Sequence, residues 1–381
     1  MFIESAFWIH SFLEESGIIY TFEGARKNCT LKTILRIHNP HFYWNVMIEA
    51  DLGLADSYIN GDFSFVHKYE GLLNLFPIVI ANQDLDSSTS KLKKSWGPSQ
   101  NTSWLKPKKT KKYFFRHISR KNTLTQARRH VSRLYDPSNE LFFFLFLDKS
   151  MTYSCAIFKS KHEDLEVGQI RKVSVLIEKV KLVKGQEVLE IGCGWGTLAI
   201  EIVRQTGCKY TGITLSELQL KYAEIKVKEA GLQDTSDYIF VITVNCLKPT
   251  NMTELFLGNF STVFICGMIE AVGHDYMEEL FSCCESLLAE NGLSCSTVPD
   301  QCYDEHSLGP GFIKEYIFPS GCLPSLRRVT SAMTSSSRLC VEHLENIETH
   351  YYQKLRRWRQ KFREKHSEIL ALGFNEKFVR T

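Results

Sequence analysis

An acidic residue and three evenly spaced glycines stand close together in Glu190-Ile191-Gly192-Cys193-Gly194-Trp195-Gly196. They follow a short β-branched run and precede a helix-like stretch. Glycine lets a backbone approach a ligand at positive φ, so this order predicts a binding loop at the carboxyl end of a strand. The spacing G-x-G-x-G differs from the G-x-G-x-x-G of dinucleotide sites. A carboxylate there would repel a pyrophosphate, but it suits a ligand with ammonium and sulfonium charges.

The loop also has simpler interpretations, which its residues alone leave open. Three glycines can form a tight turn that binds nothing, and Glu190 can be a solvated acid at a strand end. The choice depends on the elements that surround the loop.

Strand-like and helix-like segments alternate in this half of the chain. Between Val167 and Val180 apolar residues recur every three or four positions, which predicts a helix with one buried face. Ser216 and Gln219 belong to a capping box that opens a helix ending at Gly231. Short strands are expected at Val188 to Ile191, Tyr238 to Val244, Thr262 to Cys266 and Leu293 to Val298, with a helix between the last two. This alternation predicts an α/β fold with a doubly wound, mostly parallel sheet.

The chain before this domain has a different composition. From Tyr20 to Asp86, β-rich pieces (Thr33 to His38 and Phe42 to Glu49) alternate with glycine-containing turns. Between Ser87 and Tyr135 there are 14 lysines and arginines and no acid, which is typical of an interaction surface or a solvated linker. We expect an N-terminal tail at 1–19, a small mixed domain at 20–86, a basic linker at 87–134 and the α/β domain at 135–381.

Composition excludes several classes of protein. A chain of 381 residues with 44% apolar residues is not a collagen, a disordered tail or a small disulfide scaffold. The first twenty residues carry acids but no basic stretch, which predicts no signal peptide. The longest apolar run, Leu141 to Leu147, is far shorter than the roughly 20 residues of a spanning helix. We therefore expect a cytoplasmic protein, free or peripheral to a membrane, with reduced cysteines and no metal site.

Several separated motifs, in the same order along the chain, resemble those of cyclopropane-fatty-acyl-phospholipid synthases, above all the plant type. The glycine loop resembles the E-x-G-x-G-x-G motif of class I methyltransferases, which bind S-adenosylmethionine. The likeness runs from about Tyr20 to the last residue. The other motifs are Tyr135-Asp136, Ser138-Asn139-Glu140, Met151-Thr152-Tyr153-Ser154-Cys155-Ala156, Gly212-Ile213-Thr214-Leu215-Ser216, Met268-Ile269-Glu270-Ala271-Val272-Gly273 and Tyr316-Ile317-Phe318-Pro319-Ser320-Gly321-Cys322-Leu323-Pro324-Ser325.

The resemblance implies transfer of the methyl group of S-adenosylmethionine to a cis double bond in a phospholipid acyl chain, with formation of a cyclopropane ring. An alkene is a poor nucleophile, so the reaction needs positioning, a dry pocket and stabilisation of a carbocation. In the family a bound bicarbonate takes the proton whose loss closes the ring. The resemblance therefore implies bicarbonate as a second cofactor.

The resemblance also implies roles for single residues. The cofactor-binding positions are Tyr153 and Ser154 over the methionine end, Glu190, Gly192, Gly194 and Gly196 in the loop, and Thr214 and Gln219 at the ribose. The catalytic positions, around the bicarbonate, are Cys155, Glu270 and Tyr351. Each catalytic position has a structural alternative: core packing for Cys155, an aromatic pair with Tyr352 for Tyr351, and an acid at a helix N-terminus for Glu270.

The sequence departs from the family pattern in several places. Leu134 replaces a histidine, no acid follows the second strand, and Asn245-Cys246 stands where an acidic and an aromatic residue read the adenine. The fifth strand is shorter, and the chain ends at Thr381 before the last antiparallel strand of the family. A strand expected at Leu339 to Ile347 either slides into that place or leaves an edge unpaired. These departures favour, as the alternative, an inactive relative that retains cofactor or lipid binding. Methylation of a soluble small molecule is a third interpretation.

The expected partners follow from charge. The basic block has no motif or aromatic spacing typical of nucleic-acid sites, so we expect no nucleic acid partner. A solvated linker and contact with an anionic membrane surface both fit it. The cationic and aromatic run Lys354 to Arg363 fits the same surface or an exposed helix face. The sequence leaves the oligomeric state open, a homodimer included.

Overall fold

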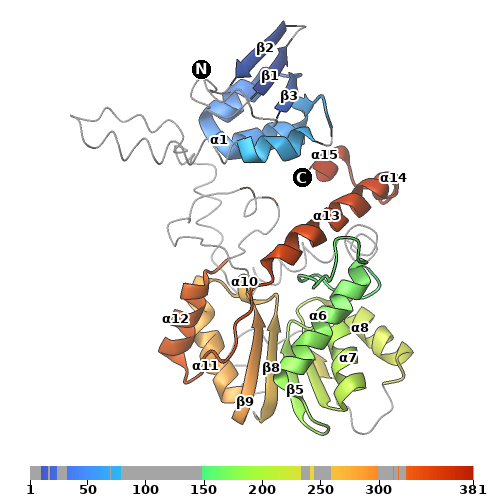
Figure 1. Ribbon diagram of the computed structural model, residues 1–381, viewed down its shortest axis with the longest axis vertical. Helices are drawn as coiled ribbons and strands as arrows, with labels where there is room; N and C mark the ends of the chain where they lie inside the picture. The colour runs from blue at the N-terminus through green and yellow to red at the C-terminus, as the bar shows by residue number, and fades with distance from the viewer. Residues whose placement is uncertain are drawn as a thin grey trace, which may run out of the picture. The chain divides into compact units, whose positions relative to one another are not determined.

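A computed structural model describes residues 10–15, 18–23, 32–68, 70–78, 148–232, 241–243, 259–298, 312, 316 and 323–380 (Figure 1). The chain divides into two compact units, which are described separately. The first comprises residues 1–116, 310–312 and 375–381, and the second comprises residues 117–309 and 313–374. The predicted basic linker, Leu134 and Asn245-Cys246 lie outside the described residues.

The first unit contains a four-stranded sheet of order β2-β1-β3-β4. β1 (His10–Glu15) pairs antiparallel with β2 (Ile18–Glu23) and parallel with β3 (Lys32–Ile37), and β3 pairs antiparallel with β4 (Phe63–Phe65). Helix α1 (His41–Asn60) packs Phe42 against Phe63 and Phe65. Near its end, Asn60 accepts a 3.0 Å hydrogen bond from Lys377 of α15 (Glu376–Arg380).

Two predictions about this unit are wrong. The expected tail at 1–19 contains β1, which is paired on both of its edges. The expected strand at Phe42 to Glu49 is part of α1 instead. Phe42, Val46, Leu54 and Tyr58 join the same core at intervals of four or eight residues, so helical periodicity outweighed the strand propensity of the aromatic and β-branched residues.

The second unit contains a parallel five-stranded sheet of order β7-β6-β5-β8-β9, which confirms the predicted fold class. From β5 the chain winds outward to β7 and then returns to β8 on the other side of β5, so the order reverses between β5 and β8. Ligands of open α/β sheets bind at the carboxyl ends of the strands beside such a reversal. The strands are β5 (Glu187–Ile191), β6 (Lys209–Ile213), β7 (Val241–Thr243), β8 (Phe260–Cys266) and β9 (Leu288–Thr297).

Helices cover both faces of this sheet (Figure 1). Leu189 and Ile191 point to the core shared with α11 and α12, whereas Val188 points to the core shared with α6 and α7. The helices of the unit are α6 (Leu165–Val180), α7 (Thr197–Thr206), α8 (Glu217–Glu229), α10 (Ile269–Val272), the 3-10 turn η1 (His274–Tyr276), α11 (Met277–Leu287), α12 (Leu326–Ser336), α13 (Glu348–Glu364) and α14 (His366–Ala371).

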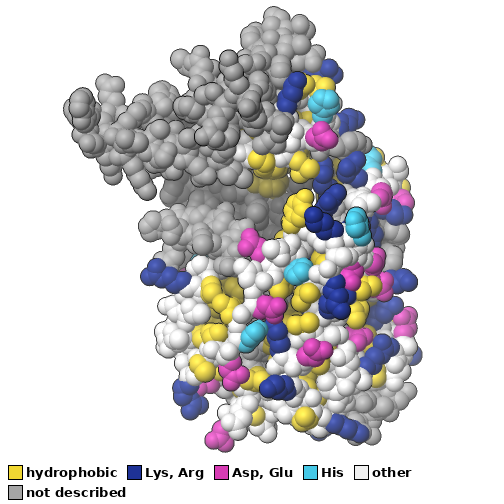
Figure 2. Space-filling model, viewed as in Figure 1, with side chains coloured by type: hydrophobic (Ala, Val, Ile, Leu, Met, Phe, Trp, Pro, Cys, Tyr) yellow, Lys and Arg dark blue, Asp and Glu magenta, His cyan; other side chains and the backbone are white. Residues whose placement is uncertain are grey.

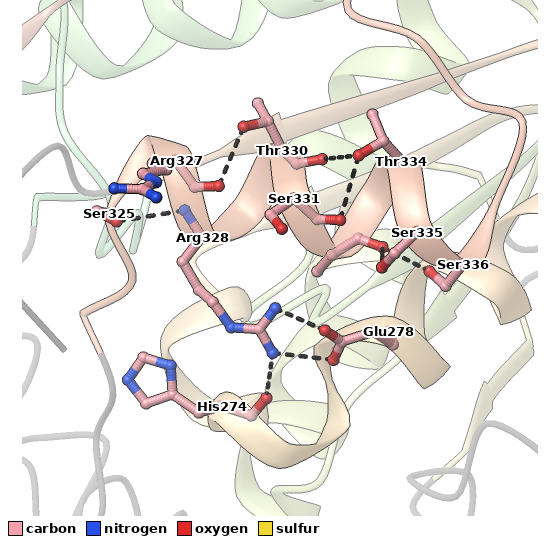
Figure 3. A network of polar contacts seen from close by, with 11 residues as sticks. His274, Glu278, Ser325, Arg327, Arg328, Thr330, Ser331, Thr334, Ser335 and Ser336 are labelled. Atoms are coloured by element: carbon pink, nitrogen blue, oxygen red, sulfur yellow. Dashed lines mark hydrogen bonds and ion pairs between the residues drawn. The ribbon is translucent and has the colours of Figure 1, made fainter.

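Helix α12 is held to the neighbouring α11 by one arginine as well as by apolar packing. Arg328 donates to both carboxylate oxygens of Glu278, at 2.6 and 2.9 Å, and to the carbonyl oxygen of His274 at 2.7 Å (Figure 3). This bidentate contact holds the pKa of Glu278 below its usual value. Ser325 caps the helix by accepting a hydrogen bond from the Arg328 amide at 3.2 Å.

The strand predicted at Leu339 to Ile347 is wrong. These residues form neither helix nor strand, and Val341 and Leu344 are exposed. The segment is fastened by side chains instead, since Lys179 of α6 pairs with Glu345. Within the described residues, no strand follows β9 in this sheet.

Two classes of feature are absent from the described part of the chain. None of its helices is long and apolar enough to cross a bilayer. It also contains no cluster of three or more His, Cys, Asp or Glu side chains suited to a metal ion.

Candidate functional site

The glycine loop joins β5 to α7 at the carboxyl edge of the sheet, as the sequence predicts. Gly192 and Gly194 have φ of +89° and +54°. A Cβ on Gly192 would lie 2.1 Å from the Met268 Cγ, whereas a Cβ on Gly194 would meet no atom of the described residues within 4 Å. Gly192 is therefore required for packing against Met268, and Gly194 faces open space. The loop is anchored by two hydrogen bonds from the amides of Gly192 and Cys193 to the carbonyl oxygen of Ile213.

Glu190 is buried, not solvated. Only 3% of its surface is exposed, and it accepts a hydrogen bond from the Tyr210 hydroxyl of β6. Burial raises the pKa of Glu190 to about 7, while the hydrogen bond from Tyr210 and the nearby charge of Lys172 oppose this rise. The carboxyl group thus points toward the side of the sheet that α6 covers, rather than into open solvent at the strand end.

Thr214 and Gln219, the two residues expected at the ribose, are brought together by the turn between β6 and α8. The Thr214 hydroxyl donates to Gln219 Oε1 at 2.9 Å and accepts from the Ser216 amide at 3.3 Å. Ser216 caps α8 by accepting from the Gln219 amide, which confirms the predicted capping box in its first half. Both side chains are buried, so this turn is held in one shape by its own polar groups.

The segment Tyr153 to Cys155 precedes α6 and is fixed by that helix. Gln169 donates from Nε2 to the carbonyl oxygens of Thr152 and Ser154, both at 3.0 Å. Lys172, which is 4% exposed, donates from Nζ to Ser154 Oγ at 2.9 Å. Two buried polar groups of α6 therefore set the position of the residues that we expected over the methionine end of a cofactor.

The three predicted catalytic residues share one neighbourhood. The Tyr351 phenol interacts electrostatically with both Cys155 and Glu270, which come from different parts of the chain. Burial raises the pKa of all three groups, although Tyr351 keeps 44% of its surface exposed. The Glu270 Oε2 atom is buried and has no hydrogen-bond partner within the described chain. A buried polar atom without a partner at a sheet edge points to a polar ligand there.

Lys354 also belongs to this neighbourhood, although we expected it on a cationic surface. It is fully buried, and its Nζ donates to the carbonyl oxygen of Tyr153. The ring of Trp358 lies 3.8 Å from that Nζ, measured to its centroid, and stacks on the ring of Tyr153. The spacing of Tyr351, Lys354 and Trp358 on one helix face is the signal in the sequence that could have found this contact.

A cavity of about 340 Å³ lies beside the loop, between α6, α7 and α8. Trp195, Thr197 and Tyr222 line it together with charged residues of both signs, and Glu270 is not among its lining residues. The cavity is therefore separate from the predicted catalytic residues.

The chain is similar in sequence to several known proteins. A family described as mycolic acid cyclopropane synthetase matches residues 122–381. The tuberculostearic acid methyltransferase UfaA1 of Mycobacterium tuberculosis is 32% identical over 270 residues, which is 67% of this chain and 59% of that protein. The cyclopropane-fatty-acyl-phospholipid synthase of Escherichia coli K12 is 28% identical over 346 residues, which is 91% of this chain and 80% of that protein. This chain thus spans less than two thirds of the first of these relatives.

The fold of the chain is also similar to those of solved structures. The cyclopropane synthase MmaA2 from Mycobacterium tuberculosis has a TM-score of 0.57 at 25% identity, covering 66% of this chain and 88% of its own. The mycolic acid cyclopropane synthase CmaA1 complexed with SAH and CTAB also has a TM-score of 0.57 at 25% identity, covering 66% of this chain and 89% of its own.

Proposed function

The chain belongs to the mycolic acid cyclopropane synthetase family, and from this premise we propose that it transfers the methyl group of S-adenosylmethionine to a cis double bond in a phospholipid acyl chain. The product is a cyclopropane ring. The observation that carries the proposal is the open glycine loop at Gly194, at the same sheet edge as Glu270. The cofactor and the acceptor double bond need such shared access.

The residues of the loop fit S-adenosylmethionine. Gly194 leaves space where a side chain would intrude, and the turn that contains Thr214 and Gln219 lies at the end of the neighbouring strand β6. Tyr153 and Ser154 are fixed from α6, and we propose that they cover the methionine end. We propose that Glu190 supports the loop from the end of β5, where its buried carboxyl group accepts a hydrogen bond from the Tyr210 hydroxyl.

Cys155, Glu270 and Tyr351 fit a bicarbonate. The Cys155 thiol and the Tyr351 phenol offer hydrogen-bond donors for an oxyanion, and the unpartnered Oε2 of Glu270 can accept a hydrogen bond from the hydroxyl of bicarbonate. Bicarbonate, when bound, supplies a base for the proton that is lost during ring closure. The protein's part is to hold that base and keep water away, because a carbocation reacts with water.

We also propose that the protein contacts an anionic membrane surface, where its acyl substrate resides. On the face drawn in Figure 2, acidic and basic side chains of the described residues are interspersed. The segregated positive charge of the chain is instead the block between Ser87 and Tyr135. Helix α13 supports the proposal because it exposes Tyr352, Leu355 and Arg356, residues suited to a lipid interface.

The proposed function is tested first by calorimetric titration of the full chain with S-adenosylmethionine, and then by lipid analysis. The chain is expressed in bacteria that lack cyclopropane lipids, and their acyl chains are compared with those from cells expressing Glu270→Gln. New ring-containing acyl chains in the first strain alone are expected. Cofactor binding without any new lipid would instead support an inactive relative, and no detectable binding at millimolar cofactor would contradict the proposal.

A further inference from the structure

Lys354 brings a buried amino group to the predicted catalytic residues, and burial lowers the pKa of that group well below its usual value. Its Nζ donates to the Tyr153 carbonyl oxygen. The same atom lies 3.8 Å from the ring centroid of Trp358 and 5.5 Å from the ring centroids of Tyr153 and Tyr351. Three aromatic rings and a carbonyl oxygen are favourable contacts for an ammonium group, and they offset part of the cost of charging this buried amine.

No carboxylate neutralises this ammonium group within the described chain, where Lys354 forms no ion pair. Asp148 acts on it only at longer range, and a second buried cation, Lys172, opposes its charge. Lys172 has Glu190 in electrostatic range, and that carboxyl already accepts the Tyr210 hydroxyl. Charging this buried amine without a counter-ion is costly, so its ammonium form is favoured only when an anion lies beside it.

The neighbouring catalytic residues need such a cation if they are to hold an anion. The Cys155 thiol and the Tyr351 phenol can donate hydrogen bonds, but neither they nor the Glu270 carboxyl group can balance a negative charge. Cys155 interacts electrostatically with Lys354, and the Tyr351 ring centroid lies 5.5 Å from Lys354 Nζ. An ammonium group has three donors, and the Tyr153 carbonyl oxygen occupies one of them.

We propose that Lys354 is the cationic ligand of the bicarbonate site formed by Cys155, Glu270 and Tyr351. This inference rests on the proposed function, which assigns an oxyanion to those three residues. It extends that function by naming the residue that balances the negative charge, and this residue belongs to α13. Trp358 and Tyr153 then act as positioning residues that hold the Lys354 side chain in place.

The proposed role implies a link between anion binding and proton uptake. Burial and Lys172 lower the pKa of Lys354, whereas Cys155 and Asp148 raise it. An anion beside Nζ favours the ammonium form, so binding must raise the pKa of Lys354. Bicarbonate affinity is then expected to fall as the pH rises through the pKa of Lys354 in the free protein.

The test is calorimetric titration of the full chain with sodium bicarbonate at constant ionic strength set by sodium chloride. We expect saturable binding to the wild type and binding weaker by roughly thirtyfold or more in Lys354→Met, because one partner of a buried charge pair is removed. Lys228→Met, at an exposed lysine of α8, is the matched control and should bind as the wild type does. Equal affinity of Lys354→Met and the wild type, or no binding to the wild type, would overturn the proposal.

Two further measurements keep the result interpretable. If Lys354→Met does not fold, Lys354→Gln replaces it, since glutamine retains a donor without the charge and should show the same loss. A parallel titration with S-adenosylmethionine separates this inference from the proposed function. Bicarbonate binding without cofactor binding would contradict the function and support the anion site, whereas the reverse result would overturn the anion site alone.

Discussion

The rings of Tyr153 and Trp358 stack with their centroids 5.1 Å apart and their planes at 29°. This contact joins the segment before α6 to helix α13. Trp358 also belongs to a buried cluster with Met151 and with Trp195 of the glycine loop. The loop, the Tyr153 segment and α13 therefore support one another, and the predicted site is shaped by residues distant in the sequence.

The first prediction concerns this aromatic cluster. Trp358→Ala should lower the free energy of unfolding by about 3–5 kcal/mol, because a large buried ring is replaced by a cavity. Urea unfolding of the full chain measures the change. Tyr352→Ala, at a side chain that is 72% exposed on the same helix, should stay within about 0.5 kcal/mol of the wild type. Similar effects of the two changes would show that the cluster does not stabilise the unit.

A second prediction separates two glycines of the same loop. Gly192→Ala should destabilise the protein by about 3 kcal/mol, because positive φ and overlap with Met268 act together. Gly194→Ala has only the backbone penalty, about 1 kcal/mol, since its Cβ would enter open space.

For Gly194→Ala, the loss of cofactor affinity should be larger than the loss of stability. Gly194→Ala is expected to weaken S-adenosylmethionine binding by roughly tenfold or more, because the added Cβ enters the space assigned to the cofactor. Urea unfolding measures the free energy of unfolding, and calorimetric titration of the same samples measures the affinity for S-adenosylmethionine. Unchanged cofactor affinity in Gly194→Ala would remove the loop from the binding site.

The buried carboxyl group of Glu190 predicts a specific dependence of stability on pH. Its folded pKa is raised from 4.5 to about 7, so the folded chain retains a proton that the unfolded chain releases. Glu190 therefore stabilises the fold fully below its unfolded pKa, and this contribution is lost as the pH rises through about 7.

The variant Glu190→Gln tests this dependence, because glutamine has a similar size but does not ionise. Relative to the wild type, the variant should gain about 3 kcal/mol of unfolding free energy between pH 4 and pH 8. Urea unfolding at both pH values measures the gain, and Glu187→Gln, at a half-exposed acid on the same strand, is the control. A difference between variant and wild type that does not change with pH would contradict the buried position of Glu190.

The basic block predicts salt-dependent lipid binding. The 14 cations between Ser87 and Tyr135 have no acid among them, so they should attract vesicles that contain anionic lipid. Vesicle co-sedimentation should decrease as sodium chloride is raised, because salt screens the attraction. Binding that is insensitive to ionic strength would favour the solvated linker, as would equal binding to neutral vesicles.

Much of the α/β unit could be predicted from local sequence signals. The periodic apolar residues of α6, the serine cap of α8 and the run before the glycine loop each specify an element within a few residues. The strand expected at Phe42 to Glu49 shows the limit of such signals, because aromatic and β-branched residues there also fit one helix face. The segment from Leu339 to Ile347 shows a second limit, since a strand requires a partner edge that local sequence does not reveal.

The chemistry of the site was less predictable than its fold. The burial of Glu190 against Tyr210 depends on the register of two parallel strands. Lys354 stands among arginines and lysines, and only the packing of α13 separates its buried side chain from exposed Arg356. A run of cationic residues in the sequence predicts an exposed surface, and only the packing of α13 shows that Lys354 is buried beside the predicted catalytic residues.

The most direct test of the proposed function follows the methyl group itself. The purified full chain is incubated with S-adenosylmethionine labelled in its methyl group and with vesicles of unsaturated phospholipid, and the acyl chains are analysed by mass spectrometry. We expect labelled acyl chains that are one methylene group heavier and resistant to hydrogenation of the double bond. Recovery of all the label in unreacted cofactor, under conditions in which the chain binds that cofactor, would contradict it.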